Sequence, residues 1–230
     1  MTYKIVFVDE ETRARNSFMR NFIEENKDKF EGVPLAPKQT IEEMIEVIFE
    51  NNPDLILTDF SLNDFHATDQ TYRVEYDGGE LACEILDRRE NFPIFIATSL
   101  GDDAARKGYD VKLIYEKYGS FKDTSSNNNR GQTESDGQHL TFADKVLYEI
   151  YSYKKHIEDC SKKFDLLIEK RSTQELSYIE EAELIRLDGI LERAIDKRSS
   201  IDNDLKSTSN SKKLENLLLI AQKILDKTND

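Results

Sequence analysis

The sequence has few of the residues that mark disulfide-rich, zinc-binding and membrane-spanning proteins. It contains two cysteines, Cys83 and Cys160, no tryptophan and four prolines among its 230 residues. The cysteines stand far apart and outside any CxxC or Cys/His spacing, which excludes a disulfide framework and a zinc site. We therefore interpret them as reduced core thiols. No apolar run approaches the roughly 20 residues of a transmembrane helix, so we expect no membrane partner.

Positive charge is also scarce. The chain has 32 Lys and Arg against 46 Asp and Glu, which gives a formal net charge of −14. Proteins that bind DNA or RNA usually carry a basic patch that neutralises phosphates. Neither half of this chain has a basic excess, and residues 140–230 contain no helix-turn-helix pattern, so we expect no nucleic-acid partner. The first residues lead directly into an apolar strand without signal-peptide features, which predicts a cytoplasmic protein.

Hydrophobic periodicity divides the chain into an α/β part and a helical part. The expected strands cover residues 4–8, 33–36, 54–58, 92–98 and 111–115. The helices expected between them cover residues 13–25, 41–51 and 79–89. Nearly unbroken apolar strands are typical of parallel sheets covered on both faces, whereas Pro34 predicts a short, irregular edge strand. This alternation predicts an α/β domain with a doubly wound, five-stranded parallel sheet in residues 1–118.

The sequence of the second half of the chain predicts helices. Residues 119–139 are polar and rich in Ser, Asn and Gly, which predicts a linker or a disordered loop. Apolar residues then recur at spacings of three and four from Val146 to Leu167, the pattern of a long helix with a heptad seam. A capping box at Ser177 predicts a second helix, and a third apolar stripe follows at residues 214–225.

We therefore expect residues 140–230 to form an all-α helical bundle, a helical hairpin or a coiled-coil-like domain. Its apolar seams suit an intramolecular core, the binding of a partner helix, or self-association as a homodimer.

Polar side chains stand at the points where the predicted strands end. The set consists of Asp9 and Glu10 after the first strand, Asp59 after the third, Thr98 after the fourth and Lys117 after the fifth. Because the carboxyl ends of parallel strands meet at one edge of a sheet, these side chains are expected to lie close together.

This set resembles the receiver domain of response regulators. In that family an acidic pair follows the first strand, a phosphorylated Asp the third, Ser or Thr the fourth and Lys the fifth. The resemblance covers residues 1–118 and implies a flavodoxin-like fold. It implies a two-component phosphorelay protein that receives its phosphoryl group from a sensor histidine kinase or phosphotransfer protein. The helical region would signal to a downstream protein, with no enzymatic activity beyond the chain's own phosphorylation and dephosphorylation.

The resemblance also implies a role for each residue. Asp59 is the phosphoacceptor, since a carboxylate can attack phosphorus and form an acyl phosphate. Lys117 would pair with the phosphoryl oxygens, and the Thr98 hydroxyl would move to hydrogen-bond the phosphoryl group. Mg²⁺ is the implied cofactor, and its implied ligands are Asp9, Glu10, Asp59 and the backbone carbonyl of Ser61.

Several features depart from the receiver pattern. Tyr118 stands where the family usually has proline, and Ile114 stands where many receivers have an aromatic residue that turns inward on activation. About a dozen extra residues, 66–77, follow Asp59 and form either a lid over the phosphosite or a solvated surface loop. The fourth helix is expected to be truncated. Two alternatives stay open, namely a phosphate sink without a separate output and a receiver-like adaptor that is not phosphorylated.

Overall fold

The chain divides into two compact units. One comprises Met1–Asp87 and Asn91–Tyr153, and the other comprises Arg88–Glu90 and the residues from Lys154 onward. The computed structural model describes residues 2–63, 72–98, 107–109, 113–116, 140–202 and 206. Within this part of the chain, no helix is both long and apolar enough to cross a membrane.

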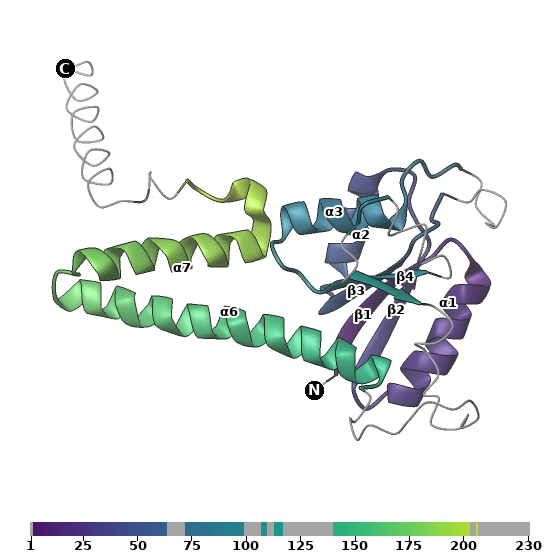
Figure 1. The fold of residues 1–230 in the computed structure, drawn as a ribbon, viewed down its shortest axis with the longest axis horizontal. Coiled ribbons are helices and arrows are strands. Elements are labelled where there is room, and N and C mark those ends of the chain that lie inside the picture. Colours follow the sequence, from purple (N-terminus) through teal and green to yellow (C-terminus); the bar gives the residue numbers. More distant parts are fainter. Residues whose placement is uncertain are drawn as a thin grey trace, which may run out of the picture. The chain divides into compact units, whose positions relative to one another are not determined.

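A parallel sheet lies at the centre of the first unit (Figure 1). Its strands are β1 (Tyr3–Val8), β2 (Phe30–Leu35), β3 (Leu55–Asp59), β4 (Ile94–Thr98) and β5 (Ile114–Glu116). They lie in the order β2-β1-β3-β4-β5, and each neighbouring pair is parallel. This is the order of flavodoxin-like sheets, in which ligands bind outside the carboxyl ends of the strands. The predicted α/β class and parallel sheet are confirmed.

The edge strand β2 is longer than the sequence predicts. It runs through Pro34, which lies opposite Phe7 of β1. Proline lacks a backbone N–H, but an edge strand has only one neighbour and tolerates it. The prediction of a short strand at residues 33–36 therefore overestimated the effect of this proline.

Helices cover both faces of the sheet. They are α1 (Thr12–Phe18), continued by a π-helical turn Met19–Ile23 and a 3₁₀ turn Glu24–Asn26, then α2 (Ile41–Glu50) and α3 (Gly78–Arg88). The core under α2 and α3 includes Val6, Val8, Met44, Ile48, Ile56, Leu81, Ile85 and Ile96. The core on the other face includes Ile5, Phe7, Phe18, Phe22, Leu57, Phe95, Phe142 and Ile150. Successive strand residues thus supply opposite cores, as the two-residue period of a strand requires.

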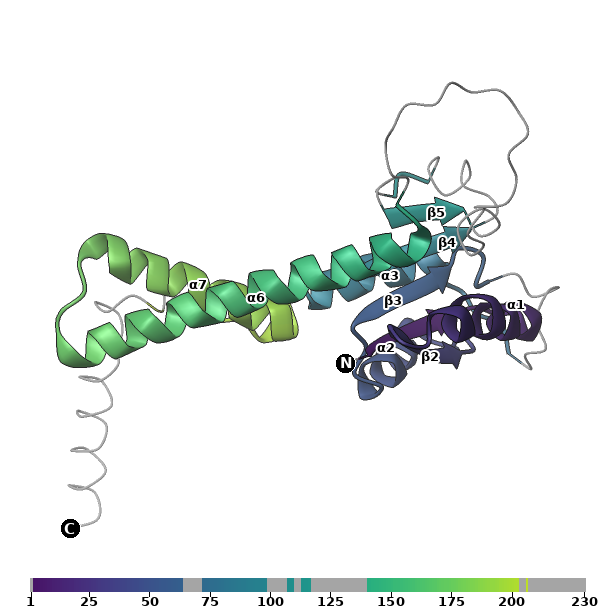
Figure 2. The ribbon, with the colours of Figure 1, turned by 90° about the horizontal axis from the view of Figure 1, so that it is seen from below.

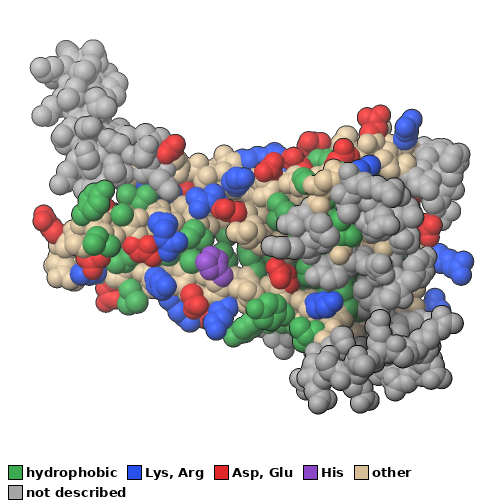
Figure 3. Space-filling model, viewed as in Figure 1, with side chains coloured by type: hydrophobic (Ala, Val, Ile, Leu, Met, Phe, Trp, Pro, Cys, Tyr) green, Lys and Arg blue, Asp and Glu red, His purple; other side chains and the backbone are tan. Residues whose placement is uncertain are grey.

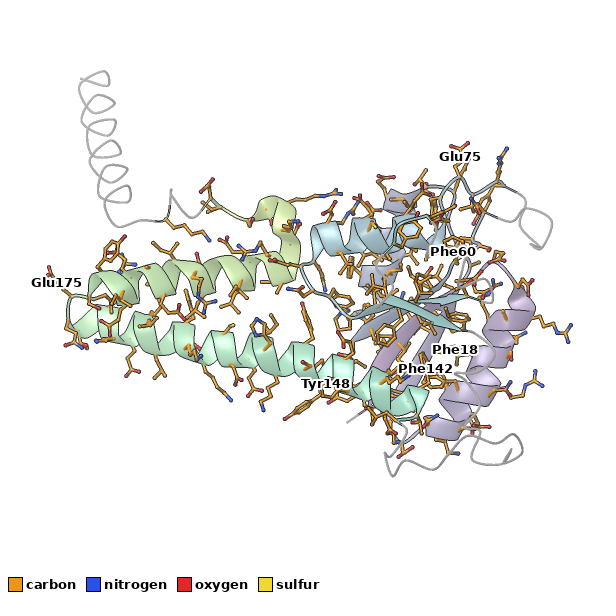
Figure 4. All side chains as sticks on the ribbon, viewed as in Figure 1. Phe18, Phe60, Glu75, Phe142, Tyr148 and Glu175 are labelled. Atoms are coloured by element: carbon orange, nitrogen blue, oxygen red, sulfur yellow. The ribbon has the colours of Figure 1, made fainter. Side chains whose placement is uncertain are left out.

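The long helix α6 (Phe142–Thr173) is continuous and contributes to both units (Figure 2). Its first turns pack in the unit that contains the sheet. The rings of Phe142 and Phe22 have centroids 5.3 Å apart, and Tyr153 lies 5.7 Å from Phe92. Phe142 and Phe18 both point into this core (Figure 4).

The unit boundary differs from the one expected from the sequence. The sequence predicts a first domain that ends at residue 118, whereas the unit that contains the sheet runs to Tyr153. An amphipathic stripe can pack equally well on a sheet or on another helix, so periodicity alone did not identify this boundary. The predicted linker at residues 119–139 lies outside the described residues.

We expect Ile150→Val to lower the free energy of unfolding of the first unit by roughly 1 kcal/mol, because Ile150 is fully buried in that unit's core. Leu166→Val on the same helix is the matched control, since the Leu166 side chain is 65 % exposed. Urea denaturation of both variants measures the difference. An equal cost at the two positions would contradict the packing of α6 against the sheet.

In the second unit, α7 (Tyr178–Asp196) runs back alongside α6 and ends in a 3₁₀ turn, Lys197–Ser199 (Figures 1 and 2). The buried residues of this hairpin include Cys160, Leu184 and Leu187. The prediction of a core thiol is thus confirmed for Cys160, but it is wrong for Cys83 on α3, which is exposed. Acidic and basic side chains are intermixed along it on the face shown in Figure 3. The third helix predicted at residues 214–225 lies outside the described part.

The capping box predicted at the start of α7 is present. The Glu180 N–H donates to Ser177 Oγ, and the Ser177 N–H donates to Glu180 Oε2 at 3.1 Å. Lys170 also donates to the Glu180 carboxylate. These contacts lower the pKa of Glu180 from 4.5 to about 2, and the hydrogen bond from Lys170 has the largest effect.

This lowered pKa predicts an acid-sensitive hairpin. A carboxylate with a lowered folded-state pKa stabilises the fold above its unfolded-state pKa and loses that effect as the pH falls. The contribution of Glu180 should therefore be complete above pH 4.5 and disappear towards about pH 2. We expect wild type to melt above Glu180→Gln at neutral pH, with a gap that closes over this window, as followed by circular dichroism. A gap independent of pH would contradict the assignment.

Candidate functional site

Three carboxylates meet at the carboxyl edge of the sheet. Asp9 and Glu10 follow β1, and Asp59 ends β3. Their exposed fractions are 0, 4 and 4 %, and one oxygen of each lies within 4.8 Å of the others. Val8 of β1 pairs with Thr58 of β3, and the two strands are parallel, so both end at this edge of the sheet. The structure therefore brings these three predicted site residues together.

The oxygens of this cluster suit a hard cation. Asp9 Oδ1 accepts a hydrogen bond from the Glu11 N–H at 2.8 Å, and Asp59 Oδ2 accepts one from the Ser61 N–H at 3.0 Å. Asp9 Oδ2 and Glu10 Oε2 are buried and accept no hydrogen bond from the described residues. Closely spaced buried carboxylates disfavour each other's charge, and Mg²⁺ prefers carboxylate oxygen ligands. The residues present therefore fit the Mg²⁺ ion that the resemblance to receiver domains implies.

Arg15 supports the acidic pair from α1. Its guanidinium donates to the backbone carbonyl of Asp9 and, at 2.8 Å, to Thr12 Oγ1. The Asp9 N–H donates to the carbonyl of Leu35 in β2 at 3.2 Å. The turn after β1 is thus held from two sides. Arg15 was not predicted from the sequence, where the available signal was its place in the first helical turn after the acidic pair.

Another predicted residue, Thr98, lies along the same edge. Thr98 ends β4 and is buried. Because Asp59 pairs with Ala97, Thr98 stands one residue further along the edge than Asp59. Thr98 itself pairs with Glu116, the last residue of β5. Lys117 follows Glu116 and lies outside the described residues.

The backbone of Asp59 is in close contact with the start of α3. The Gly78 N–H donates to the carbonyl of Phe60 at 2.9 Å, and Thr58 Oγ1 donates to the carbonyl of Asp59 at 3.1 Å. A Cβ atom at position 78 would lie 1.8 Å from that Asp59 carbonyl oxygen. Position 78 therefore requires glycine, because no side chain fits beside the backbone there.

The described end of the insertion, residues 72–77, packs into the protein. Val74 and Tyr76 are buried in the core under α2 and α3. Glu75 between them is exposed and points outward (Figure 4). The interpretation of a solvated surface loop is therefore wrong for this part of the insertion.

Hydrogen bonds also fix this segment. The Tyr72 hydroxyl donates to the carbonyl of Pro37 at 2.6 Å, and the Tyr76 hydroxyl donates to the carbonyl of Lys38 at 2.9 Å. Burial raises the pKa of Tyr76, which keeps its hydroxyl protonated as a donor. Both tyrosines thus anchor the insertion to the segment after β2. Residues 66–71, the other part of the predicted lid, lie outside the described residues.

Comparison with known proteins identifies no family. No family model and no curated protein matches the sequence. Among solved structures, the fold is similar to the crystal structure of the anti-anti-sigma factor PhyR from Bartonella quintana, with a TM-score of 0.41 and 11 % sequence identity. The similarity covers 70 % of this chain and 52 % of that one, so this chain matches about half the length of PhyR.

Proposed function

We propose that this chain is a receiver-type phosphoacceptor that carries a phosphoryl group on Asp59. The observation that carries the proposal is the cluster of Asp9, Glu10 and Asp59, three buried carboxylates within 4.8 Å of one another. They stand at the carboxyl edge of a parallel sheet with flavodoxin-like strand order, which is where ligands bind in such sheets.

In the proposed reaction, an Asp59 carboxylate oxygen attacks the phosphorus of a phosphohistidine on a sensor histidine kinase or phosphotransfer protein. The new O–P bond forms as the P–N bond breaks, and the electron pair of that bond stays on the imidazole nitrogen. The Ser61 N–H, 3.0 Å from Asp59 Oδ2, orients the nucleophile. Thr98 and Lys117 would contact the transferred oxygens.

The proposed cation ligands are Asp9, Glu10, Asp59 and the Ser61 carbonyl oxygen. Bound Mg²⁺ would supply charge neutralisation for carboxylates and phosphoryl oxygens that otherwise repel one another.

We further propose that the α6–α7 hairpin delivers the output through contact with a downstream protein or a second copy of the chain. Tyr178 and Ile179, adjacent residues at the start of α7, are 86 and 78 % exposed, and adjacent exposed apolar side chains are suited to contact with a protein partner. The net charge of −14 disfavours a nucleic-acid target. We also propose that the protein acts in the cytoplasm together with its phosphodonor.

The test is incubation with Mg²⁺ and acetyl phosphate, followed by intact mass measurement. Wild type should gain one hydroxylamine-labile phosphoryl group, and Asp59→Asn should gain none. Asp87→Asn, on α3, is the matched control and should behave like wild type. Chelation of Mg²⁺ should prevent the gain. If wild type gains nothing, the chain is a receiver-like adaptor and the proposal is wrong.

A further inference from the structure

Asp77 is a buried acid for which the proposed phosphoryl chemistry has no role. It is 2 % exposed and directly precedes Gly78, the first residue of α3. The Glu80 N–H donates to Asp77 Oδ1 at 2.9 Å, and the Asp77 N–H donates to Glu80 Oε2 at 2.9 Å. This reciprocal pair is a capping box, which fixes the first turn of the helix.

The same carboxylate binds a segment that lies 30 residues or more further along the chain. Lys107 Nζ lies 2.7 Å from Asp77 Oδ2, and the Tyr109 hydroxyl donates to Asp77 Oδ1 at 3.0 Å. The hydrogen bond from Lys107 to Asp77 raises the pKa of Lys107. The pKa of Tyr109 is raised mainly by burial and, to a smaller extent, by its own hydrogen bond to Asp77. Both groups therefore keep their protons at neutral pH. A buried carboxylate with this many donors is well compensated.

Aromatic contacts join these residues to the phosphoacceptor loop. The Tyr109 ring meets the Phe60 ring edge-on, with 6.2 Å between centroids, and Lys107 Nζ lies 5.2 Å from the Phe60 centroid. The second distance is that of a cation–π contact. A Cβ atom at Gly79 would lie 2.2 Å from the Tyr109 ring, so the start of α3 fits closely against this ring. Phe60, which is labelled in Figure 4, is the residue after Asp59 in the sequence.

A continuous path of contacts therefore leads to the Asp59 carboxylate. It starts at Asp77, which is anchored by Lys107 and Tyr109. The next residue, Gly78, donates its N–H to the Phe60 carbonyl at 2.9 Å. The Ser61 N–H in turn donates to Asp59 Oδ2 at 3.0 Å.

From this path we infer that Asp77 is a positioning residue for phosphoryl acceptance. It anchors the start of α3 to Lys107 and Tyr109 and so holds the loop 59–61, and with it the Asp59 carboxylate, in place. The inference rests on the proposed function of Asp59. Because coupling between two sites is reciprocal, a change at Asp59 should also alter the contacts that residues 107–109 make with Asp77.

The first arm of the test is backbone amide hydrogen exchange in the unmodified protein. Tyr109→Phe removes only the hydroxyl that reaches Asp77, and Asp77→Asn removes the negative charge. The Ser61 and Gly78 amides should exchange about fivefold faster in both variants than in wild type. Tyr72→Phe is the matched control, since its hydroxyl anchors the same packed segment to Pro37 instead. It should leave these two amides unchanged.

The second arm is the rate of phosphoryl acceptance from acetyl phosphate. Tyr109→Phe and Asp77→Asn should accept the group about fivefold more slowly at saturating donor. The Mg²⁺ concentration for half-maximal rate should not change, because the acids that follow β1 are intact.

The outcomes separate the inference from the proposed function. Unchanged exchange of the Ser61 and Gly78 amides in both variants overturns the inference. It is also overturned if these amides exchange faster while phosphorylation keeps its wild-type rate. A wild-type protein that accepts no phosphoryl group contradicts the proposed function, and the exchange arm then still decides whether Asp77 holds the loop.

Discussion

Gly78→Ala is expected to slow phosphoryl acceptance by Asp59 by about 100-fold, the scale of loss that follows a 1 Å misplacement at a reacting centre. The added methyl carbon would lie 1.8 Å from the carbonyl oxygen of Asp59 and 2.8 Å from its carbonyl carbon. Both atoms are backbone, so no side-chain rotation relieves the overlap. Either α3 or the end of β3 must move, and the nucleophile moves with it.

Gly32→Ala is the matched control for this variant. An added Cβ at position 32 would lie 2.6 Å from a side-chain carbon of Ile23 and 2.7 Å from the sulfur of Met19. Crowding of this kind costs about 1–3 kcal/mol of stability, but Gly32 pairs with Ile5, well before the carboxyl end of β1. Gly32→Ala should be less stable and still accept a phosphoryl group at the wild-type rate. Equal rates for wild type and Gly78→Ala, with circular dichroism confirming the fold, would contradict the close contact.

The second large effect concerns the cation. Saturating Mg²⁺ should raise the melting temperature of wild type, because a ligand present at 100 times its Kd stabilises the fold by about 2.7 kcal/mol. Asp9→Asn removes one of the three clustered carboxylates and should lose most of this rise. Without Mg²⁺, Asp9→Asn should melt roughly 2–4 °C above wild type, the shift that corresponds to about 1 kcal/mol of relieved repulsion.

Differential scanning fluorimetry with chelator and with excess Mg²⁺ measures both parts of this prediction. Glu11→Gln is the control, since Glu11 is the next acid along the chain but is exposed and outside the cluster. It should respond to Mg²⁺ as wild type does. An Asp9→Asn variant that gains as much from Mg²⁺ as wild type would show that the cation does not bind at this cluster.

The meeting of Asp9, Glu10 and Asp59 could be predicted because it depends on strand ends alone. Unbroken apolar runs locate β1 and β3, and the carboxyl ends of parallel strands share one edge of the sheet. Helix caps were also predictable because they are local. The capping box predicted at Ser177 is an example, since Ser177 Oγ accepts from the Glu180 N–H at the start of α7.

Contacts between distant segments could not be predicted in this way. The sequence Asp77-Gly-Gly-Glu80 contains the signal of a helix cap, but nothing local indicates that Lys107 and Tyr109 bind the same carboxylate. The packing of α6 is a similar case, because the stripe that contains Val146 and Ile150 reads equally well as the seam of a helical bundle. Such contacts depend on the tertiary fold, which periodicity does not encode.

The central claim is that Asp59 itself forms an acyl phosphate, and the most direct measurement locates that bond. Borohydride reduces an aspartyl phosphate to homoserine with release of phosphate. Protein treated with Mg²⁺ and acetyl phosphate and then with borohydride can be digested and its peptides analysed by tandem mass spectrometry. The proposed function predicts homoserine in place of Asp59 and at no other aspartate. Unreduced Asp59, or reduction at Asp9 instead, would contradict it.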